Sequence, residues 1–253
     1  MNIKLNPHVA LLCCNGIWGL SYPIYTYALP KHIGVEAMVT ITLVATGVLS
    51  LCSLLFKRWR EEGPKVERKD MPMLILAGLI VVLIRKYFLM AGLSMTSPID
   101  GSVIAALGPI AVLLLSVAVG QDRFSTLKII GVTLGLVGVL VMLLSNSGHQ
   151  SASNLLLGNI LIMLCVMCTA IYVVWFKDIV AKYSPMTILR WIMTSAAVII
   201  LPIGARSVTQ VDYSGFDMNM WLLLAYMTLM PTLLPNYLLM YGLKKVKPAL
   251  SSV

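Results

Sequence analysis

Charged residues are scarce in this chain. They make up 11% of its 253 residues, whereas soluble globular proteins carry about 25%. Hydrophobic residues make up 59%, so too few polar side chains remain to cover a water-facing surface. This shortage excludes a disordered tail, a secreted disulfide module and an ordinary soluble enzyme, and it predicts a protein that is surrounded mostly by lipid.

Acidic and histidine side chains are missing from the middle of every long apolar run. A proton relay needs such a group at depth, so its absence favours facilitated diffusion or exchange over proton coupling. The chain also lacks His-Glu-x-x-His, Gly-x-Ser-x-Gly and paired central carboxylates, so no catalytic residue is predicted. No second cysteine pair or nearby histidine completes Cys165-x-x-Cys168, so we predict neither a metal site nor a cofactor.

Long apolar runs are what the chain does contain. A membrane-spanning helix needs about 20 such residues, and eight runs approach this length: 8–29, 33–56, 71–96, 98–119, 128–145, 155–176, 185–205 and 220–241. The connections between them are too short to fold alone. The sequence therefore predicts an all-α, multi-pass membrane protein whose partner is the lipid bilayer rather than a nucleic acid, although the net charge is +9.

The positive charges predict how the chain is oriented in the membrane. With the N-terminus in the cytoplasm, 14 Lys and Arg residues fall in inside loops and only Lys31 and Arg206 fall outside. Cytoplasmic loops collect Lys and Arg. We therefore expect a cytoplasmic N-terminus, an outward loop at 146–154 and a bacterial inner (plasma) membrane location.

Two segments of the chain resemble each other at an offset of 150 residues. Tyr87–Pro98 and Tyr237–Pro248 share Tyr, Leu-Met, Gly-Leu and Pro at matching positions. An odd number of spans separates the copies, so the second copy lies upside down in the membrane. The loop charges agree, because Lys244, Lys245 and Lys247 fill an inside loop that corresponds to an uncharged outside loop. The sequence therefore predicts an inverted repeat of five-helix units.

The repeat divides the chain into residues 1–146 and residues 147–253. The first copy continues past Pro98 through two more spans, whereas the second stops shortly after Pro248. This arithmetic predicts eight spans and the start of a ninth, with about two C-terminal helices absent from a protein of roughly 295–300 residues. The chain alone is expected to be inactive, because its central cavity would be open on one side.

Several stretches in a fixed order resemble the EamA-type transporters of the drug/metabolite transporter superfamily. They are Trp18–Tyr22, Leu93–Pro109, Gln121–Ser125 with the glycine-rich run after it, Ala170–Tyr172, Tyr183–Pro185 and Arg190. The family's usual Glu-Arg pair after the fourth span is Asp122-Arg123 here. The resemblance implies that the chain moves a small polar metabolite by alternating access. It leaves an amino acid, an organic anion and a phosphorylated metabolite open, together with the direction of transport and the coupling ion.

Two other classes of function stay open beside transport, a membrane-embedded enzyme and a non-transporting scaffold. A homodimer is also left open. Gly131, Gly135 and Gly138 form a stripe that predicts close packing of the fifth span within the bundle.

Arg85 and Lys86 lie at the centre of the third predicted span. A central Arg or Lys costs about 2.5–3.5 kcal/mol on insertion scales, so such residues face the bundle interior or a watery cavity. Their functional interpretation is an anion-binding pair, and their structural alternative is hydrogen bonding to neighbouring helices. We expect Arg85 to be the ligand and Lys86 to bond carbonyls freed by Pro235.

The repeat and the helical spacing add further candidates for a substrate pathway. At the offset of 150, the charged pair and the tyrosine after it match Pro235, Asn236 and Tyr237. The whole predicted set consists of Arg85, Lys86, Tyr87, Pro235, Asn236, Tyr237, Asn15, Trp18, Tyr22, Tyr172 and Trp175, with Arg190 and Asp100 as secondary candidates. For the aromatic residues and Asn15, packing between helices is an equal alternative.

Overall fold

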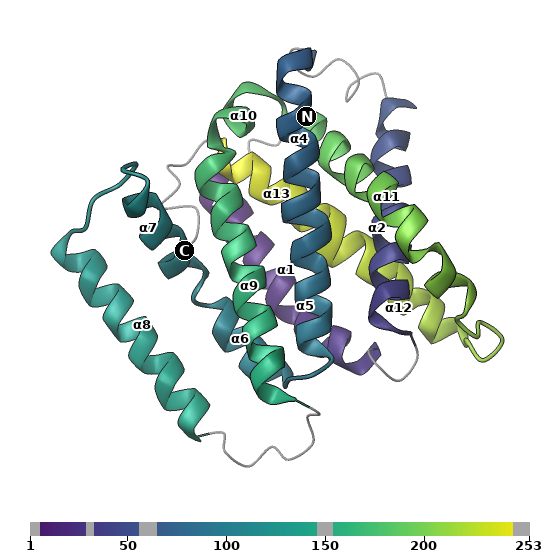
Figure 1. Cartoon of the computed structure of the whole chain (residues 1–253), viewed down its shortest axis with the longest axis horizontal. Coiled ribbons are helices and arrows are strands. Elements are labelled where there is room, and N and C mark those ends of the chain that lie inside the picture. Colours follow the sequence, from purple (N-terminus) through teal and green to yellow (C-terminus); the bar gives the residue numbers. More distant parts are fainter. Residues whose placement is uncertain (1–5, 29–32, 56–64, 146–153, 245–253) are drawn as a thin grey trace.

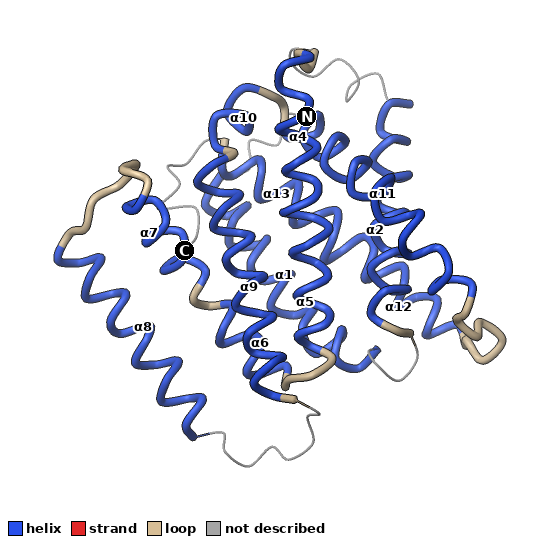
Figure 2. Tube along the Cα trace, viewed as in Figure 1, coloured by secondary structure: helices blue, strands red, loops and turns tan. Residues whose placement is uncertain are grey.

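Every regular element in the described part of the chain is a helix (Figures 1 and 2). The computed structural model describes residues 6–28, 33–55, 65–145 and 154–244. Its α-helices are α1 (Pro7–Ala28), α2 (Val35–Cys52), α4 (Met71–Ala77), α5 (Arg85–Leu93), α6 (Pro98–Ala105), α7 (Gly108–Ala118), α8 (Thr126–Ser145), α9 (Leu155–Trp175), α10 (Lys177–Lys182), α11 (Pro185–Thr209), α12 (Met218–Thr228) and α13 (Leu234–Leu243). The predicted all-α class is confirmed.

Four short elements extend these helices. Two are 3-10 turns, η1 (Ser53–Leu55) and η2 (Arg68–Asp70). The other two are π-helical segments, η3 (Gly78–Ile84) and η4 (Leu229–Leu233), which join α4 to α5 and α12 to α13. The predicted offset of 150 superimposes residues 78–84 on 228–234, a range that contains the second π segment. The inverted repeat itself stays a prediction.

Six helical segments are long and apolar enough to cross a membrane. They are Val35–Leu55, Arg68–Leu93, Pro98–Ala118, Leu155–Trp175, Pro185–Thr209 and Met218–Leu243. Two further predicted spans coincide with α1, whose polar residues lower its hydropathy, and α8, whose described apolar part at Thr126–Val141 is shorter. The structure therefore supports a multi-pass membrane protein, and the count of eight spans stays a prediction. The predicted loop at 146–154 lies almost wholly outside the described residues.

Two helices begin at the same Ser-Pro signal. Ser97 precedes α6 and its hydroxyl accepts a hydrogen bond from the Asp100 N–H at 3.0 Å. Ser184 precedes α11 and accepts from the Thr187 N–H at 3.1 Å. The proline that follows each serine has its backbone angle preset for a helix, so cap and proline together fix where α6 and α11 start.

The helices pack in pairs around a shared core (Figure 1). α2 lies along α11, α5 along α9, and α1 along α13. Where α5 and α9 cross, a Cβ on Gly92 would lie 2.9 Å from the Gly158 carbonyl oxygen, and one on Gly158 would lie 3.0 Å from the Gly92 oxygen. Two glycines therefore let the backbones touch at this crossing.

The predicted close packing of the glycine stripe in α8 is wrong for two of its three residues. Among the described residues, a Cβ on Gly131 or Gly138 would meet nothing within 4 Å, and only Gly135 has a close neighbour, Ile110 Cδ1 at 2.9 Å. α8 stands apart at the edge of the bundle in Figure 1, and most of its described side chains are exposed. The spacing of the glycines predicts that they share one face of the helix, but it does not predict whether another helix packs against that face.

An ion cluster joins the segment before α4 to the α10–α11 corner, at the end of the bundle predicted to face the cytoplasm. Lys182 Nζ lies 2.6 Å from both Glu67 Oε1 and Asp70 Oδ2. The Tyr183 hydroxyl donates to Asp70 Oδ2 at 2.5 Å and accepts from the Glu67 N–H at 3.1 Å. Lys244 Nζ donates to the Tyr183 carbonyl at 3.0 Å. The cluster therefore links segments from both predicted halves.

This cluster predicts a dependence of stability on acid. The hydrogen bond from Lys182 holds the pKa of the Glu67 carboxyl below its ordinary value of 4.5. A lowered folded-state pKa stabilises the fold above about pH 4.5, and the contribution is lost as the pH falls through the folded pKa. Lys182→Met should lower the melting temperature at pH 7, and the difference from wild type should shrink towards pH 3. Thermal unfolding across this range tests it, with Lys177→Met as the control; a gap that does not change with pH would contradict it.

Candidate functional site

A cavity of about 500 Å³ lies between helices from both predicted halves of the chain. Its polar and aromatic lining comes from α1, α5, α6 and α9: Asn15, Trp18, Tyr22, Arg85, Ser102, Cys165 and Thr169. Apolar residues of α5, α6, α7, α9 and α13 complete it, and Gly108 and Pro109, the first residues of α7 after its break from α6, border it. Among the described residues, Arg85 is the one charged group in the lining. The cavity is therefore suited to a small ligand that carries a negative charge.

Arg85 is the first residue of α5, directly after the π segment η3, and only 9% of it is exposed. Its Nε donates to the Val81 carbonyl at 2.8 Å. Its guanidinium carbon lies 4.9 Å from the centre of the Trp18 ring, and the group also contacts the Cys165 thiol. A carbonyl, an aromatic ring and a thiol do not neutralise a buried cation, so an anion in the cavity would gain the full attraction of Arg85.

A hydrogen bond holds Trp18 beside Arg85, and its acceptor is a backbone carbonyl that a proline leaves without its usual partner. Pro235 has no N–H to donate to the carbonyl of Pro231, four residues earlier. The Trp18 indole N–H donates to that carbonyl instead, at 3.0 Å. The Pro235 carbonyl accepts a hydrogen bond from the Cys14 thiol at 3.3 Å. The Pro231 carbonyl of η4 is therefore satisfied by a side chain of α1, as the low-dielectric setting requires.

Lys86 lies beside Arg85 but points elsewhere. It is 4% exposed, and its ammonium donates to the Thr232 hydroxyl rather than to a carbonyl freed by Pro235. Thr232 in turn donates to the Met227 carbonyl at 2.9 Å, which Pro231 leaves without its usual partner. The predicted carbonyl contact of Lys86 is thus wrong. The side chain bridges α5 to the second π segment, and it does not line the large cavity.

Lys86 lines a second, much smaller cavity of about 10 Å³. Trp18 and Arg85 line both cavities, whereas Tyr25, Lys86, Thr232 and Asn236 line only the small one. Asn236 donates from Nδ2 to the Thr232 carbonyl at 2.5 Å, and its buried Oδ1 has no hydrogen-bond partner among the described residues. The volume is about that of one water molecule, so this space is too small for a substrate.

The predicted candidates fall into three sets: those at the large cavity, those at the small cavity and those at neither. Asn15, Trp18, Tyr22 and Arg85 meet at the large cavity, and Lys86 and Asn236 meet at the small one. The others line neither cavity in the described structure: Tyr87, Tyr237, Pro235, Tyr172, Trp175 and Asp100. Tyr87 and Trp175 are 39% and 49% exposed on the outside of the bundle.

Tyr172 and Asp100 are buried but serve other contacts. The ring of Tyr172 stacks on Phe176 with centroids 5.7 Å apart, and its hydroxyl has no hydrogen-bond partner among the described residues. Asp100 lies in the first turn of α6. Arg190 lines a separate groove between α2, α4 and α11. These placements leave Arg85 as the predicted cation that reaches the large cavity.

Several residues at the two cavities were not predicted from the sequence. Tyr25 lies one turn beyond Tyr22 on the face of α1 that also carries Trp18. Its helical spacing from these two residues could have identified it from the sequence. Cys165 and Thr169 share one face of α9. The sequence does not predict the contact of Thr232 with Lys86, because the position of Thr232 depends on the π segment that contains it. No group of metal-ligating side chains occurs in the described ranges, and Cys165 and Cys168 are free thiols.

Known proteins resemble this chain over most of its length. A model of the EamA-like transporter family matches residues 7–144 and 156–253. An "Uncharacterized transporter" of Archaeoglobus fulgidus is 25% identical over 203 residues, which cover 80% of this chain and 68% of that protein. The "Uncharacterized transporter YetK" of Bacillus subtilis is 24% identical over 76% of this chain and 59% of its own.

The similarity extends to a third transporter and to a solved structure. The "Uncharacterized transporter YyaM" of Bacillus subtilis is 22% identical over 74% of this chain. The chain spans about three fifths of YetK and YyaM, 59% and 61% of their lengths. A crystal structure matches with a TM-score of 0.69 at 18% identity, over 97% of this chain and 82% of that one. At this identity the match supports the fold.

Proposed function

Because the chain belongs to the EamA-like transporter family, we propose that it carries a small organic anion across a membrane by alternating access. One observation carries the proposal: Arg85 lies buried at a cavity of about 500 Å³ whose described lining holds no other charged residue. Small-molecule sites commonly have volumes of about 300–1,000 Å³. A guanidinium binds a carboxylate or phosphate through two parallel hydrogen bonds, and an anion would offset the cost of burying it.

The rest of the lining restricts the body of the substrate. Trp18 and Tyr22 offer aromatic surface beside Arg85, and Asn15, Ser102 and Thr169 offer hydrogen-bonding groups at other points of the cavity. No carboxylate of the described residues lines the cavity, so a cationic group of the substrate gains no ion pair from them. We therefore favour a carboxylate or phosphate with a partly apolar body over a polycation or a large sugar.

Alternating access requires contacts between the two halves that can break at one end. Near the middle, Lys86 reaches Thr232 and Trp18 reaches the Pro231 carbonyl. At the end predicted to face the cytoplasm, Lys182 reaches Glu67 and Asp70. In inverted-repeat carriers the site stays near the midplane while the halves rock around it. We expect the Lys182 contacts to break as the cytoplasmic side opens and the central ones to persist.

Counterflow into proteoliposomes tests the proposed function. Liposomes that contain the reconstituted full-length protein are loaded with a candidate compound and assayed for uptake of its radioactive form. The panel comprises amino acids, organic acids and phosphorylated metabolites, each paired with a neutral analogue of similar volume. Uptake should occur for an anion and should be weaker for its neutral partner. A carrier that accepts only cations or neutral compounds would contradict the proposal.

Labelling of single cysteines tests the proposed orientation. Ser214 follows α11 and Asp178 lies in α10, near opposite ends of the same long helix. In a background without the native cysteines, Ser214→Cys should react with a membrane-impermeant maleimide in intact cells. Asp178→Cys should react only after permeabilisation. The reverse pattern would place the N-terminus outside.

A further inference from the structure

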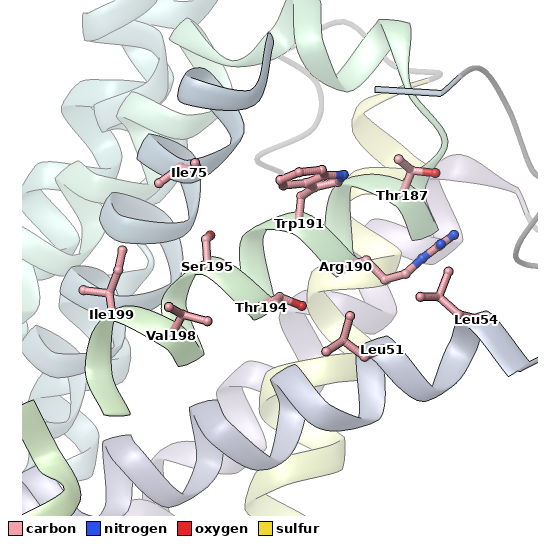
Figure 3. Close-up of a pocket in the computed structure, with 10 residues that line it drawn as sticks. All are labelled: Leu51, Leu54, Ile75, Thr187, Arg190, Trp191, Thr194, Ser195, Val198 and Ile199. Atoms are coloured by element: carbon pink, nitrogen blue, oxygen red, sulfur yellow. The ribbon is translucent and has the colours of Figure 1, made fainter. Parts of the chain in front are cut away.

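A third cavity, of about 510 Å³, lies away from the central site, as a groove between α2, α4 and α11 (Figure 3). The three helices belong to segments that are long and apolar enough to span a membrane. The groove is open along its side, and its apolar walls are only partly covered: Leu51 and Ile75 are each 43% exposed, and Val198 is 66% exposed. The described residues therefore leave the apolar walls of this groove uncovered.

The residues of the groove change in character along α11. Arg190 lies near one end, Thr194 lies four residues further on, and Val198 another four, so the three share one side of the helix. In Figure 3 the Arg190 guanidinium points towards Thr187 and Leu54, at the end opposite Val198 and Ile199. The order along the groove is thus a cation, a hydroxyl and then an apolar channel.

Thr194 adds a second and independent sign of a ligand. Its hydroxyl oxygen is buried and has no hydrogen-bond partner among the described residues. An unsatisfied hydroxyl in an apolar setting destabilises the fold, and rotation of the Thr194 side chain towards an acceptor in the groove would remove this cost. Ser195 does not share the need, because it donates to the Ile192 carbonyl at 3.2 Å.

We propose that this groove binds one anionic phospholipid, with the phosphate at Arg190, an ester carbonyl at Thr194 and an acyl chain along Leu51, Ile75 and Val198. The eight residues from Arg190 to Val198 rise by about 12 Å, close to the roughly 15 Å depth of one leaflet's hydrocarbon layer. The charge of Arg190 favours an anionic headgroup. In a zwitterionic lipid the phosphate is already balanced by the ammonium group of the same headgroup, whereas the net negative charge of an anionic lipid attracts Arg190. The proposal does not depend on the substrate of the central cavity.

Native mass spectrometry of the detergent-purified full chain tests the proposal, with dioleoyl phosphatidylglycerol and dioleoyl phosphatidylcholine as probes. One phosphatidylglycerol should be retained per chain, about tenfold more tightly or better than phosphatidylcholine, as expected for a charge-assisted contact. Arg190→Gln should reduce this affinity to that for phosphatidylcholine. Arg206→Gln, an exposed arginine at the other end of α11, should leave the preference unchanged.

A second variant covers the case in which Arg190→Gln fails to fold. Val198 is 66% exposed, so Val198→Trp should fold and fill the apolar end of the groove, and it should remove the tightly held lipid. Equal retention of both lipids by the wild type would overturn the proposal. So would a preference that survives in Arg190→Gln or Val198→Trp, or a dimer whose formation displaces the lipid, since the occupant would then be a second copy of the chain.

Discussion

Arg85→Ala is expected to weaken substrate binding by about 10- to 150-fold while leaving the fold intact. This range corresponds to the loss of a charge-assisted contact worth about 1.5–3 kcal/mol. The folded protein should tolerate the change, because Arg85 makes no ion pair with a described residue of the cavity lining and its removal spares the cost of burying a cation. Binding of the best anion from the counterflow panel, measured on purified protein, gives the affinity.

Two further variants separate binding from folding. Arg85→Lys keeps the charge but loses the two-pronged grip, so it should also be impaired. Arg206→Ala removes an exposed arginine far from the cavity and should bind as the wild type does. Folded yield is measured separately for each variant by size-exclusion chromatography. If Arg85→Ala is well folded and binds the anion with unchanged affinity, Arg85 is not the ligand.

Gly78→Ala is expected to cause a large loss of stability for so small a substitution. A Cβ on Gly78 would clash with Ser195 Oγ and would lie 2.7 Å from the Ile192 carbonyl oxygen on α11. The serine side chain can rotate away, but the backbone oxygen cannot, so η3 and α11 must separate. Overpacking of this kind costs about 1–3 kcal/mol or more, and we expect a lower melting temperature and a lower folded yield.

The matched control is Gly131→Ala, in which the same methyl group is added on α8. A Cβ there would meet no described residue within 4 Å, so the melting temperature should stay the same or rise slightly with the better helix propensity of alanine. Thermal unfolding of both variants in one detergent makes the comparison. Equal melting temperatures for Gly78→Ala and the wild type would show that η3 and α11 do not pack as described.

The sequence predicted much of the fold because lipid imposes simple rules. Apolar runs of about 20 residues mark helices, and the predicted ranges agree with the described helices to within a few residues. The i, i+3, i+7 spacing of Asn15, Trp18 and Tyr22 predicted a shared face, and the structure brings all three to the large cavity. Their role in binding stays a prediction.

The rest depended on features that a helical pattern does not carry. A π segment adds a residue to a turn and shifts the phase of the helix after it, so the side on which Thr232 and Asn236 lie could not be read from a regular helix. Neighbours on a helix point about 100° apart. For this reason Arg85 reaches the large cavity, Lys86 turns to Thr232, and Tyr87 faces outward.

The most direct test of the central claim compares ligand charge with residue charge. Affinities are measured for four combinations: wild type and Arg85→Ala, each with the transported carboxylate and with its amide analogue. If Arg85 binds the anionic group, the wild type should prefer the carboxylate by about tenfold or more, and Arg85→Ala should bind the two compounds about equally. A carboxylate preference that persists undiminished in Arg85→Ala would show that the charge is recognised elsewhere in the protein.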